Sequence, residues 1–325
     1  MPQISMPDKN IDYYLKKFDQ LRVDRSHGRP APHKPILLLS IIEMIERGVI
    51  RENEIELTPE IVSTFLNYWS SLYPDQKGIV ALPFFHLKSD GFWHLVPSEG
   101  YEKSFKLIRH IKSSYQIRDM VKYAFLDNEL YAMLLSDNNR KLLRQVIING
   151  YFQNEERRRL IQTINLSREA MKYEHLLIAE TSEPYAANKP KERMRFKGKV
   201  REAGFRHVIM SIYNYICSVC NMRILTLEGA SVVDAAHIIP FGVSANDDIR
   251  NGIALCKLHH WSFDEGLISI DDQFRIMVTP LLSAQRPTEW LLTELRSKQV
   301  LLPQNEALYP AQEALHYHRE NKLIK

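Results

Sequence analysis

Three cysteines and one histidine constrain what the C-terminal half of this chain can fold into. All three cysteines of the 325-residue sequence lie in two spaced pairs, Cys217-x-x-Cys220 and Cys256-x-x-His259. Two half-sites of this spacing are typical of a closed tetrahedral zinc site, because each turn aims two ligands at one ion. A disulfide framework is disfavoured because every cysteine belongs to this one local pattern. We therefore predict a structural zinc ion bound by Cys217, Cys220, Cys256 and His259.

A second set of polar residues lies within the segment that the cysteines bracket. His237 stands in the sequence DAAHIIP, Asn251 in IRNGIAL, and His260 in CKLHHWSFDEG. Neighbouring side chains on a helix point roughly 100° apart, so one ion cannot easily bind both His259 and His260. We assign His259 to zinc, so His260 points away from this site. Asp264, one helical turn after His260, lies on the same face of the helix as His260.

Taken together, these motifs resemble the HNH endonuclease family, whose ββα-metal fold places one hairpin and one helix around a catalytic cation. The similar segment runs from Tyr213 to about Val278. The resemblance implies that His237 is the general base, since an imidazole with an ordinary pKa near ~6.5 accepts a proton at neutral pH. It also implies that Asn251 holds the hairpin loop around His237, and that His260 binds the catalytic ion.

The remaining ligands of the catalytic ion are less constrained. A carboxylate-containing phosphate site suits Mg²⁺, with Mn²⁺ or Ni²⁺ as substitutes where imidazole is a ligand. The HNH family commonly supplies a ligand directly before the general base, where this chain has Ala236. Asp234 is the nearest carboxylate that can serve instead, and Asp264 is the other candidate. The sequence leaves open which of the two completes the site.

Charge adds a weaker indication of a polyanionic partner. The net charge is only +4, but the stretch KPKERMRFKGKVREAGFR, from Lys189 to Arg206, carries eight Lys or Arg against two Glu. Such a run has two interpretations, a solvated linker or a surface that contacts phosphates. Its position directly before the cysteine pairs favours phosphate contact.

The first half of the chain shows the periodicity of a helical domain. Apolar residues recur at helical spacing in residues 11–22, in the run PILLLSIIEMIER, after Thr58, and again in residues 116–153. Pro35 suits the first position of a helix and Gly48 its C-terminal cap. The runs IVALPFFHL and FWHLV are separated by the turn-forming residues KSDG, a pattern that predicts a β-hairpin.

We expect an α+β protein with two domains. A mostly helical DNA-recognition domain with a short β-hairpin occupies residues 1–155, and a polar linker without a sustained apolar period spans residues 156–198. The HNH endonuclease domain, of ββα-metal type with a structural zinc and a C-terminal extension, occupies residues 199–325. The N-terminal residues lack the pattern of a signal peptide, and no apolar run is long enough to span a membrane. We therefore expect a cytoplasmic protein.

The stretches APHKPILLLSIIEMIERGVI and LPFFHLKSDGFWHL resemble the sulfur-recognising domain of McrA-like, phosphorothioate-dependent restriction endonucleases. The resemblance implies a shallow apolar pocket for a backbone sulfur, which is larger, more polarizable and less hydrated than the oxygen it replaces. The candidates for this pocket are Leu82, Pro83 and Phe84. The family often has tyrosine at the position of Leu82. Candidate DNA contacts come from the basic loop before the long apolar helix, namely Arg25, His27, Arg29, His33 and Lys34.

These resemblances imply a restriction enzyme whose N-terminal domain finds modified double-stranded DNA and whose HNH domain cuts it. A homodimer or paired molecules would suit cleavage of both strands. Two alternatives remain open, an HNH enzyme that reads a methylated base or an unmodified site, and a DNA-binding protein without nuclease activity. The presence of His237, Asn251 and His260 favours an active enzyme over the last. For His33 and Lys34 the alternative role is to cap or solvate the start of a helix.

Overall fold

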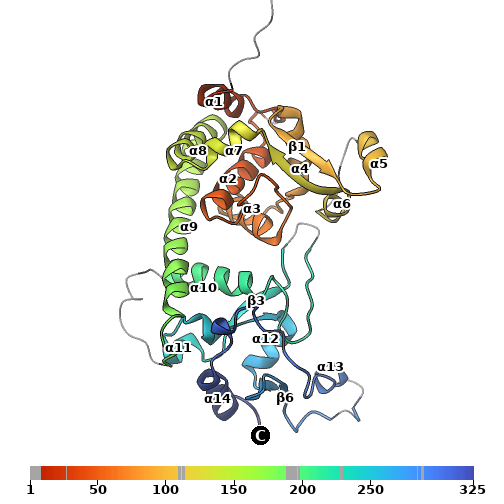
Figure 1. The fold of residues 1–325 in the computed structure, drawn as a ribbon, viewed down its shortest axis with the longest axis vertical. Coiled ribbons are helices and arrows are strands. Elements are labelled where there is room, and N and C mark those ends of the chain that lie inside the picture. The colour runs from red at the N-terminus through yellow and green to blue at the C-terminus, as the bar shows by residue number, and fades with distance from the viewer. Residues whose placement is uncertain are drawn as a thin grey trace, which may run out of the picture. The chain divides into compact units, whose positions relative to one another are not determined.

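A computed structural model of the chain describes residues 9–26, 28–108, 111, 114–187, 196, 198–226, 230–283, 285–286 and 289–325. Contacts between residues divide the chain into two compact units. The first comprises Met1–Ile164 with Leu225–Ala230, and the second comprises Asn165–Ile224 with Ser231–Lys325. Both contain helices and short antiparallel strands, so the predicted α+β class is confirmed (Figure 1). None of the helices within the described ranges is long and apolar enough to cross a membrane.

The first unit is mainly helical, as predicted, and its central helix is α2. This helix is buried from Lys34 to Ile45 and packs against α3, α4 and α8. Pro35 lies in its first turn, and Gly48 follows its end with a φ of 68°, a left-handed conformation that glycine adopts readily. The elements of the unit, in chain order, are α1 (Ile11–Asp19), α2 (His33–Glu46), α3 (Pro59–Leu72), α4 (Ala81–His86), η1 (Leu87–Asp90), β1 (Trp93–Pro97), α5 (Glu102–Leu107), α6 (Ser114–Met120), β2 (Val121–Leu126), α7 (Asn128–Leu134) and α8 (Asp137–Tyr151).

The predicted hairpin between IVALPFFHL and FWHLV does not form, because only the second of these runs is a strand and it pairs with a different segment. Strand β1 pairs with β2, which lies in a stretch that we predicted to be helical, and the run IVALPFFHL forms α4 instead. Val80, Phe84 and Leu87 are fully buried and recur at helical spacing, so burial of one face favours the helix. Pro83 is compatible with this helix because the first four N–H groups of a helix have no intrahelical partner.

The polar segment predicted as a linker is largely helical. Helix α9 (Asn154–Glu180) begins in the first unit and ends in the second. Its first turns bring Arg159 to 3.4 Å from Glu155, one turn earlier, and bury Leu160. Ion pairs and widely spaced apolar residues thus maintain a helix that apolar periodicity alone did not reveal.

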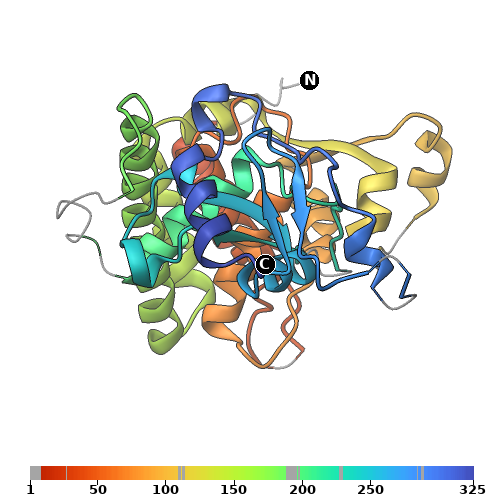
Figure 2. The ribbon, with the colours of Figure 1, turned by 90° about the horizontal axis from the view of Figure 1, so that it is seen from below.

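The second unit contains the predicted ββα arrangement. Strand β3 pairs antiparallel with β4 so that His237 lies opposite Gly252, and α12 follows β4 directly. Helix α10 packs on both strands, and α14 packs on β5 (Figure 2). The elements are α10 (Gly198–Ile212), β3 (Val233–His237), α11 (Phe241–Ser244), η3 (Ile249–Asn251), β4 (Gly252–Cys256), α12 (Lys257–Asp264), β5 (Ile268–Ile270), β6 (Ile276–Val278), α13 (Trp290–Thr293), η4 (Glu306–Leu308) and α14 (Gln312–Asn321).

Candidate active site and DNA-binding pocket

The four predicted zinc ligands lie together. The sulfur atoms of Cys217, Cys220 and Cys256 and a ring nitrogen of His259 all lie within 4.8 Å of one another. His259 Nδ1 is 3.5 Å from Cys217 Sγ and 3.2 Å from Cys256 Sγ. Tetrahedral zinc, with bonds of about 2.3 Å to sulfur and about 2.0 Å to nitrogen, requires a separation of about 3.5 Å between such ligand atoms. The donor set therefore fits a structural zinc ion.

The local fold explains why these ligands meet. Cys256 ends β4 and precedes the first residue of α12, so its thiol and the His259 ring, one helical turn later, point the same way. Burial disfavours a charged His259 ring, but hydrogen bonds with Cys217 and Cys256 raise the pKa of His259 to about 9. The cluster therefore attracts a positive charge, which a zinc ion supplies when the thiols are deprotonated.

His237, the predicted general base, is the last residue of β3 and is held on two sides. Its Nε2 lies 2.8 Å from Oδ1 of Asp247, and its ring stacks on Phe205 of α10 with centroids 3.9 Å apart and planes 5° apart. Gly252, opposite His237 on β4, has no side chain and therefore leaves room for α10 to bring Phe205 against the His237 ring. A Cβ at Gly252 would lie 2.9 Å from Phe205 Cζ and 2.4 Å from Ile209 Cδ1. The ring of His237 therefore has little freedom, although its side chain remains 24% exposed.

Asp247 is a buried carboxylate with three side-chain partners. In addition to His237, it accepts hydrogen bonds at Oδ2 from the hydroxyl of Tyr173, at 2.7 Å, and from Nε of Arg201, at 2.9 Å. Burial raises the pKa of Asp247, but hydrogen bonds from His237, Tyr173 and Arg201 lower it more, so the pKa lies below its ordinary value. The guanidinium group of Arg201 also lies over the ring of Phe241, 3.7 Å from its centroid. Asp247 is thus an anion at neutral pH.

Asn251 is the residue to which the resemblance to HNH nucleases assigns the loop around His237. It is fully buried, and its amide group fastens the loop that follows β3. The amide oxygen accepts a hydrogen bond from Ile239 N at 2.8 Å, and the amide nitrogen donates to the carbonyl oxygens of Ile239 and Asn246 at 3.0 and 2.9 Å. The amide therefore holds both ends of the loop that carries Asp247 next to His237.

Of the candidate ligands of the catalytic ion, two lie next to each other and the third is bound by other residues. His260 and Asp264 both lie on α12, with Nε2 of one 3.5 Å from Oδ2 of the other. Asp234 lies on β3, and its oxygens contact Arg206 Nε at 2.6 Å and Lys257 Nζ at 3.4 Å. Because two cations already compensate Asp234, the pair on α12 is the better match for a divalent ion. Ala236, at the usual ligand position, is buried.

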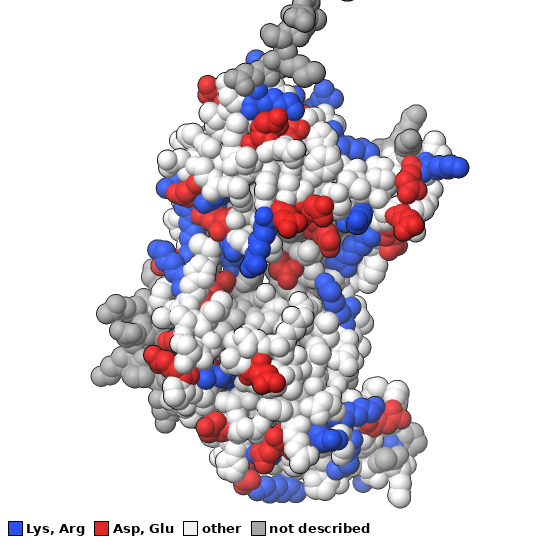
Figure 3. Space-filling view, viewed as in Figure 1, with Lys and Arg blue, Asp and Glu red and all other residues white. Residues whose placement is uncertain are grey.

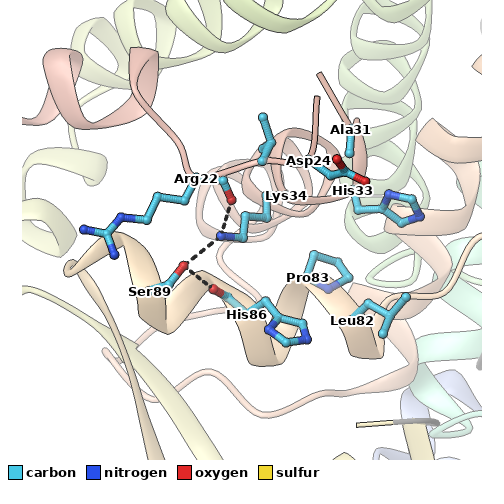
Figure 4. A pocket seen from close by; sticks show the side chains of 10 residues that line it. Arg22, Asp24, Ala31, His33, Lys34, Leu82, Pro83, His86 and Ser89 are labelled. Atoms are coloured by element: carbon cyan, nitrogen blue, oxygen red, sulfur yellow. Dashed lines mark hydrogen bonds between the residues drawn. The ribbon is translucent and has the colours of Figure 1, made fainter. Parts of the chain in front are cut away.

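A pocket of about 320 Å³ opens in the first unit, and four of the predicted contact residues line it (Figure 4). Leu82 and Pro83 come from α4, and His33 and Lys34 come from the start of α2. Burial lowers the pKa of His33, whose ring lies 4.5 Å from that of Trp69, so the imidazole is uncharged at neutral pH. The full lining comprises Arg22, Val23, Asp24, Ala31, His33, Lys34, Leu82, Pro83, His86 and Ser89.

Lys34 braces this pocket from within. Its side chain is 9% exposed, and its ammonium group donates to Arg22 O at 2.7 Å, Ser89 Oγ at 3.0 Å and Asp90 Oδ2 at 2.7 Å. An ammonium group has three hydrogens, and these three acceptors use all of them. Asp90 also accepts a hydrogen bond from Arg22 N at 2.7 Å. Lys34 therefore joins three segments of the pocket wall, which differs from the predicted phosphate contact.

Breaking this buried ion pair should destabilise the first unit. We expect Lys34→Met to lower the free energy of unfolding by about 3–5 kcal/mol, because it leaves the Asp90 carboxylate buried without a counter-charge. Chemical denaturation followed by circular dichroism measures this change. The double variant Lys34→Met with Asp90→Leu should recover most of the loss, since removing both charges is often nearly neutral. Full stability of Lys34→Met alone would contradict the bracing role.

The other predicted DNA contacts fall outside the pocket. Arg25 and Arg29 are exposed on the loop before α2, and Arg29 lies 3.6 Å from Glu156. Phe84 is fully buried and packs edge-on against Trp93, so it belongs to the core of the domain. His27 lies outside the described residues. So do residues 189–195 and 197 of the basic stretch that runs from residue 189 to residue 206.

Two arginines of that basic stretch are within the described residues, and both are already paired with carboxylates. Arg201 contacts Asp247, and Arg206 contacts Asp234. On the face shown in Figure 3, basic and acidic side chains are interspersed within each unit. The described surface of this face therefore carries no broad basic field.

Comparisons with known proteins agree with both motifs. Residues 217–271 match the family model for HNH endonucleases. These residues are thus similar to HNH endonuclease domains. Residues 11–169 match the model for the ScoMcrA-like DNA sulfur-binding domain. We refer to these two parts as the HNH domain and the ScoMcrA-like domain.

At the level of whole proteins the similarity is lower. No curated protein matches the chain. Among solved structures, a modification dependent TagI restriction endonuclease shares 20% sequence identity over 42% of this chain and 45% of that one, with a TM-score of 0.32. The match thus spans less than half the length of either protein.

Sequence reasoning missed the residues that surround His237. Asp247 stands in the polar run SANDDIRNG, where nothing distinguishes it from its neighbour Asp248. Tyr173 lies in a segment assigned to a linker, and Arg201 and Phe205 lie in a run noted only for its charge. In the ScoMcrA-like domain, His86 and Arg22 were missed as pocket residues. Only His86, within the quoted LPFFHL motif, carried a signal that pointed to this site.

Proposed function

We propose that this chain is a metal-dependent DNA endonuclease that cuts double-stranded DNA close to a phosphorothioate. The observation that carries this proposal is the character of the pocket in the ScoMcrA-like domain. Its walls include Leu82, Pro83 and an uncharged His33, and Asp90 already neutralises its buried lysine. Such a pocket offers little compensation to a hydrated phosphate oxygen but favours a poorly hydrated, polarizable sulfur.

The HNH domain supplies the groups needed for phosphodiester hydrolysis. His237 accepts a proton from the attacking water, whose oxygen forms a bond to phosphorus. The bond from phosphorus to the 3′-oxygen breaks, and the leaving oxygen takes a proton from solvent. A divalent cation such as Mg²⁺ or Mn²⁺, bound through His260 and Asp264, would stabilise charge on the phosphate. The zinc ion of the cysteine cluster would maintain the fold of the domain.

A single HNH domain holds one such set of residues and so acts on one strand at a time. Cleavage of both strands therefore requires a second copy or a second encounter, and a homodimer on a symmetric site would provide it.

A comparison of matched duplexes tests the proposal. Three DNA duplexes of one sequence would carry an internal phosphorothioate, a 5-methylcytosine or no modification, and each would be incubated with the full chain and Mg²⁺ or Mn²⁺. We expect cleavage near the phosphorothioate only. Equal cleavage of all three would reject sulfur recognition but keep the nuclease. Preference for the methylated duplex would indicate a different mark, and no cleavage of any duplex would favour the inactive DNA-binding protein.

A substitution in the pocket should reduce the preference for sulfur. Leu82→Asn keeps the size of the side chain but replaces apolar atoms with an amide, and burial of a leucine side chain contributes about 1.5–3 kcal/mol. We expect the ratio of affinities for sulfur-containing and ordinary duplex to fall about tenfold or more, as 1.4 kcal/mol corresponds to a factor of ten. Fluorescence anisotropy measures both affinities. Leu142→Asn, on the exposed face of α8, is the matched control, and an unchanged ratio in Leu82→Asn would count against the pocket.

A further inference from the structure

The contacts of Asp247 determine which nitrogen of His237 carries the proton. A carboxylate anion only accepts hydrogen bonds, and Asp247 Oδ1 lies 2.8 Å from His237 Nε2. The nitrogen Nε2 must therefore be the donor. In a neutral imidazole the other nitrogen, Nδ1, then carries the free electron pair. This is the nitrogen that can remove a proton from water.

We propose that Asp247 is a positioning residue of the HNH domain, which fixes His237 in the tautomer whose Nδ1 acts as the base. This inference rests on the proposed nuclease function and specifies how its base is prepared. An anion at this position also stabilises the imidazolium ion that forms when His237 takes up a proton. The carboxylate thus contributes both before and during the proton transfer.

The groups around this pair support a fixed geometry. Phe205 of α10 stacks on the ring of His237 and limits its tilt, while Tyr173 of α9 and Arg201 of α10 hold Asp247 Oδ2. Phe241, which follows β3, contributes a second aromatic ring, 5.8 Å from that of His237. The hydrogen bond between His237 Nε2 and Asp247 Oδ1 further restricts rotation of the imidazole ring.

The two oxygens of Asp247 have different partners, and this difference makes Asp247→Asn a sharp test. Tyr173 and Arg201 both donate to Oδ2, so the single oxygen of asparagine should remain with these two donors. The amide NH₂ group would then face His237 and donate to Nε2. All the hydrogen bonds survive, but the proton of the imidazole moves to Nδ1, which can no longer accept one from water.

The experiment measures the tautomer and the activity of the full chain in parallel. The ring ¹⁵N chemical shifts of His237, assigned with a His237→Gln variant, should show a protonated Nε2 in the parent and a protonated Nδ1 in Asp247→Asn. We expect kcat of Asp247→Asn to fall about 100-fold or more, with unchanged KM and zinc content. Asp248→Asn is the matched control, because this adjacent buried carboxylate binds Arg250 and should leave the tautomer unchanged.

The outcomes separate this inference from the proposed function. A protonated Nδ1 in the parent protein would overturn the inference without any variant. Parent-like kcat in Asp247→Asn would also overturn it, provided that a variant lacking the His237 imidazole is inactive. If the variant without the imidazole still cuts DNA, the proposed base itself is wrong. Tyr173→Phe offers a milder change should Asp247→Asn fail to fold, and it should lower kcat without altering the tautomer.

Discussion

His237→Ala is expected to abolish most DNA cleavage while DNA binding and zinc content stay at parent levels. A positioned general base typically contributes 10²–10⁴-fold to the rate, so we expect a loss of about that size. The fold should survive, because the His237 side chain is partly exposed and lies at the end of a strand rather than in its centre. Plasmid nicking in Mg²⁺ or Mn²⁺ measures the rate, and gel shift measures binding.

A histidine elsewhere in the same unit controls for the effect of removing an imidazole. His316 is exposed on α14, and His316→Ala should cut at the parent rate. If His237→Ala cuts as fast as the parent, the mechanism proposed for the HNH domain is wrong. Loss of cleavage accompanied by loss of zinc would instead indicate damage to the fold.

Cys217→Ser should prevent the second unit from folding. Structural zinc contributes about 10–16 kcal/mol to the folding of zinc-finger peptides, as much as or more than the ~5–15 kcal/mol that stabilises a whole domain. The Cys217 side chain is completely buried against His259, so serine leaves both an incomplete ligand set and a buried hydroxyl. We expect the zinc content to fall to near zero and the thermal transition of this unit to disappear. Elemental analysis and circular dichroism measure the two quantities.

Removal of the metal from the parent protein should reproduce the effect of this variant. A strong chelator should unfold the second unit of the parent, and added Zn²⁺ should restore it. Met222→Ser is the matched control, since Met222 lies two residues after Cys220, is 39% exposed and offers no ligand to the site in our assignment. A folded, zinc-free Cys217→Ser protein would show that the cluster is not structural.

The cysteine cluster could be predicted from the spacing of its residues because its geometry is local, and the ββα order was implied by the resemblance to HNH nucleases. Cys256 and His259 are separated by one helical turn, so spacing alone predicts that both reach one ion, and the paired cysteines leave few other arrangements. The same reasoning predicted α2 and α3, whose ends carry recognisable capping residues such as Thr58. The assignment of the catalytic roles to His237, Asn251 and His260 stays a prediction.

Strand pairing was harder to predict from the sequence because it depends on which distant segment lies beside the edge of the strand. Strand β1 could pair with any nearby extended segment, and its partner proved to be Val121–Leu126 rather than the adjacent aromatic run. The aromatic run is buried on a helical face around Phe84, and apolar content alone does not distinguish this from a buried strand.

The sequence by itself determined which four residues form the cysteine cluster and carried the motif by which residues 217–271 match HNH endonucleases. Only the tertiary structure decided the surroundings of those residues. It brought Asp247, Tyr173 and Arg201 together beside His237, and it buried Lys34 against Asp90 where the sequence suggested a DNA contact or a role at the start of a helix. The physical reason is that a motif specifies residue types at short spacing along the chain. The charged groups and hydrogen-bond partners around each of those residues come from distant segments, which only folding brings within about 3 Å.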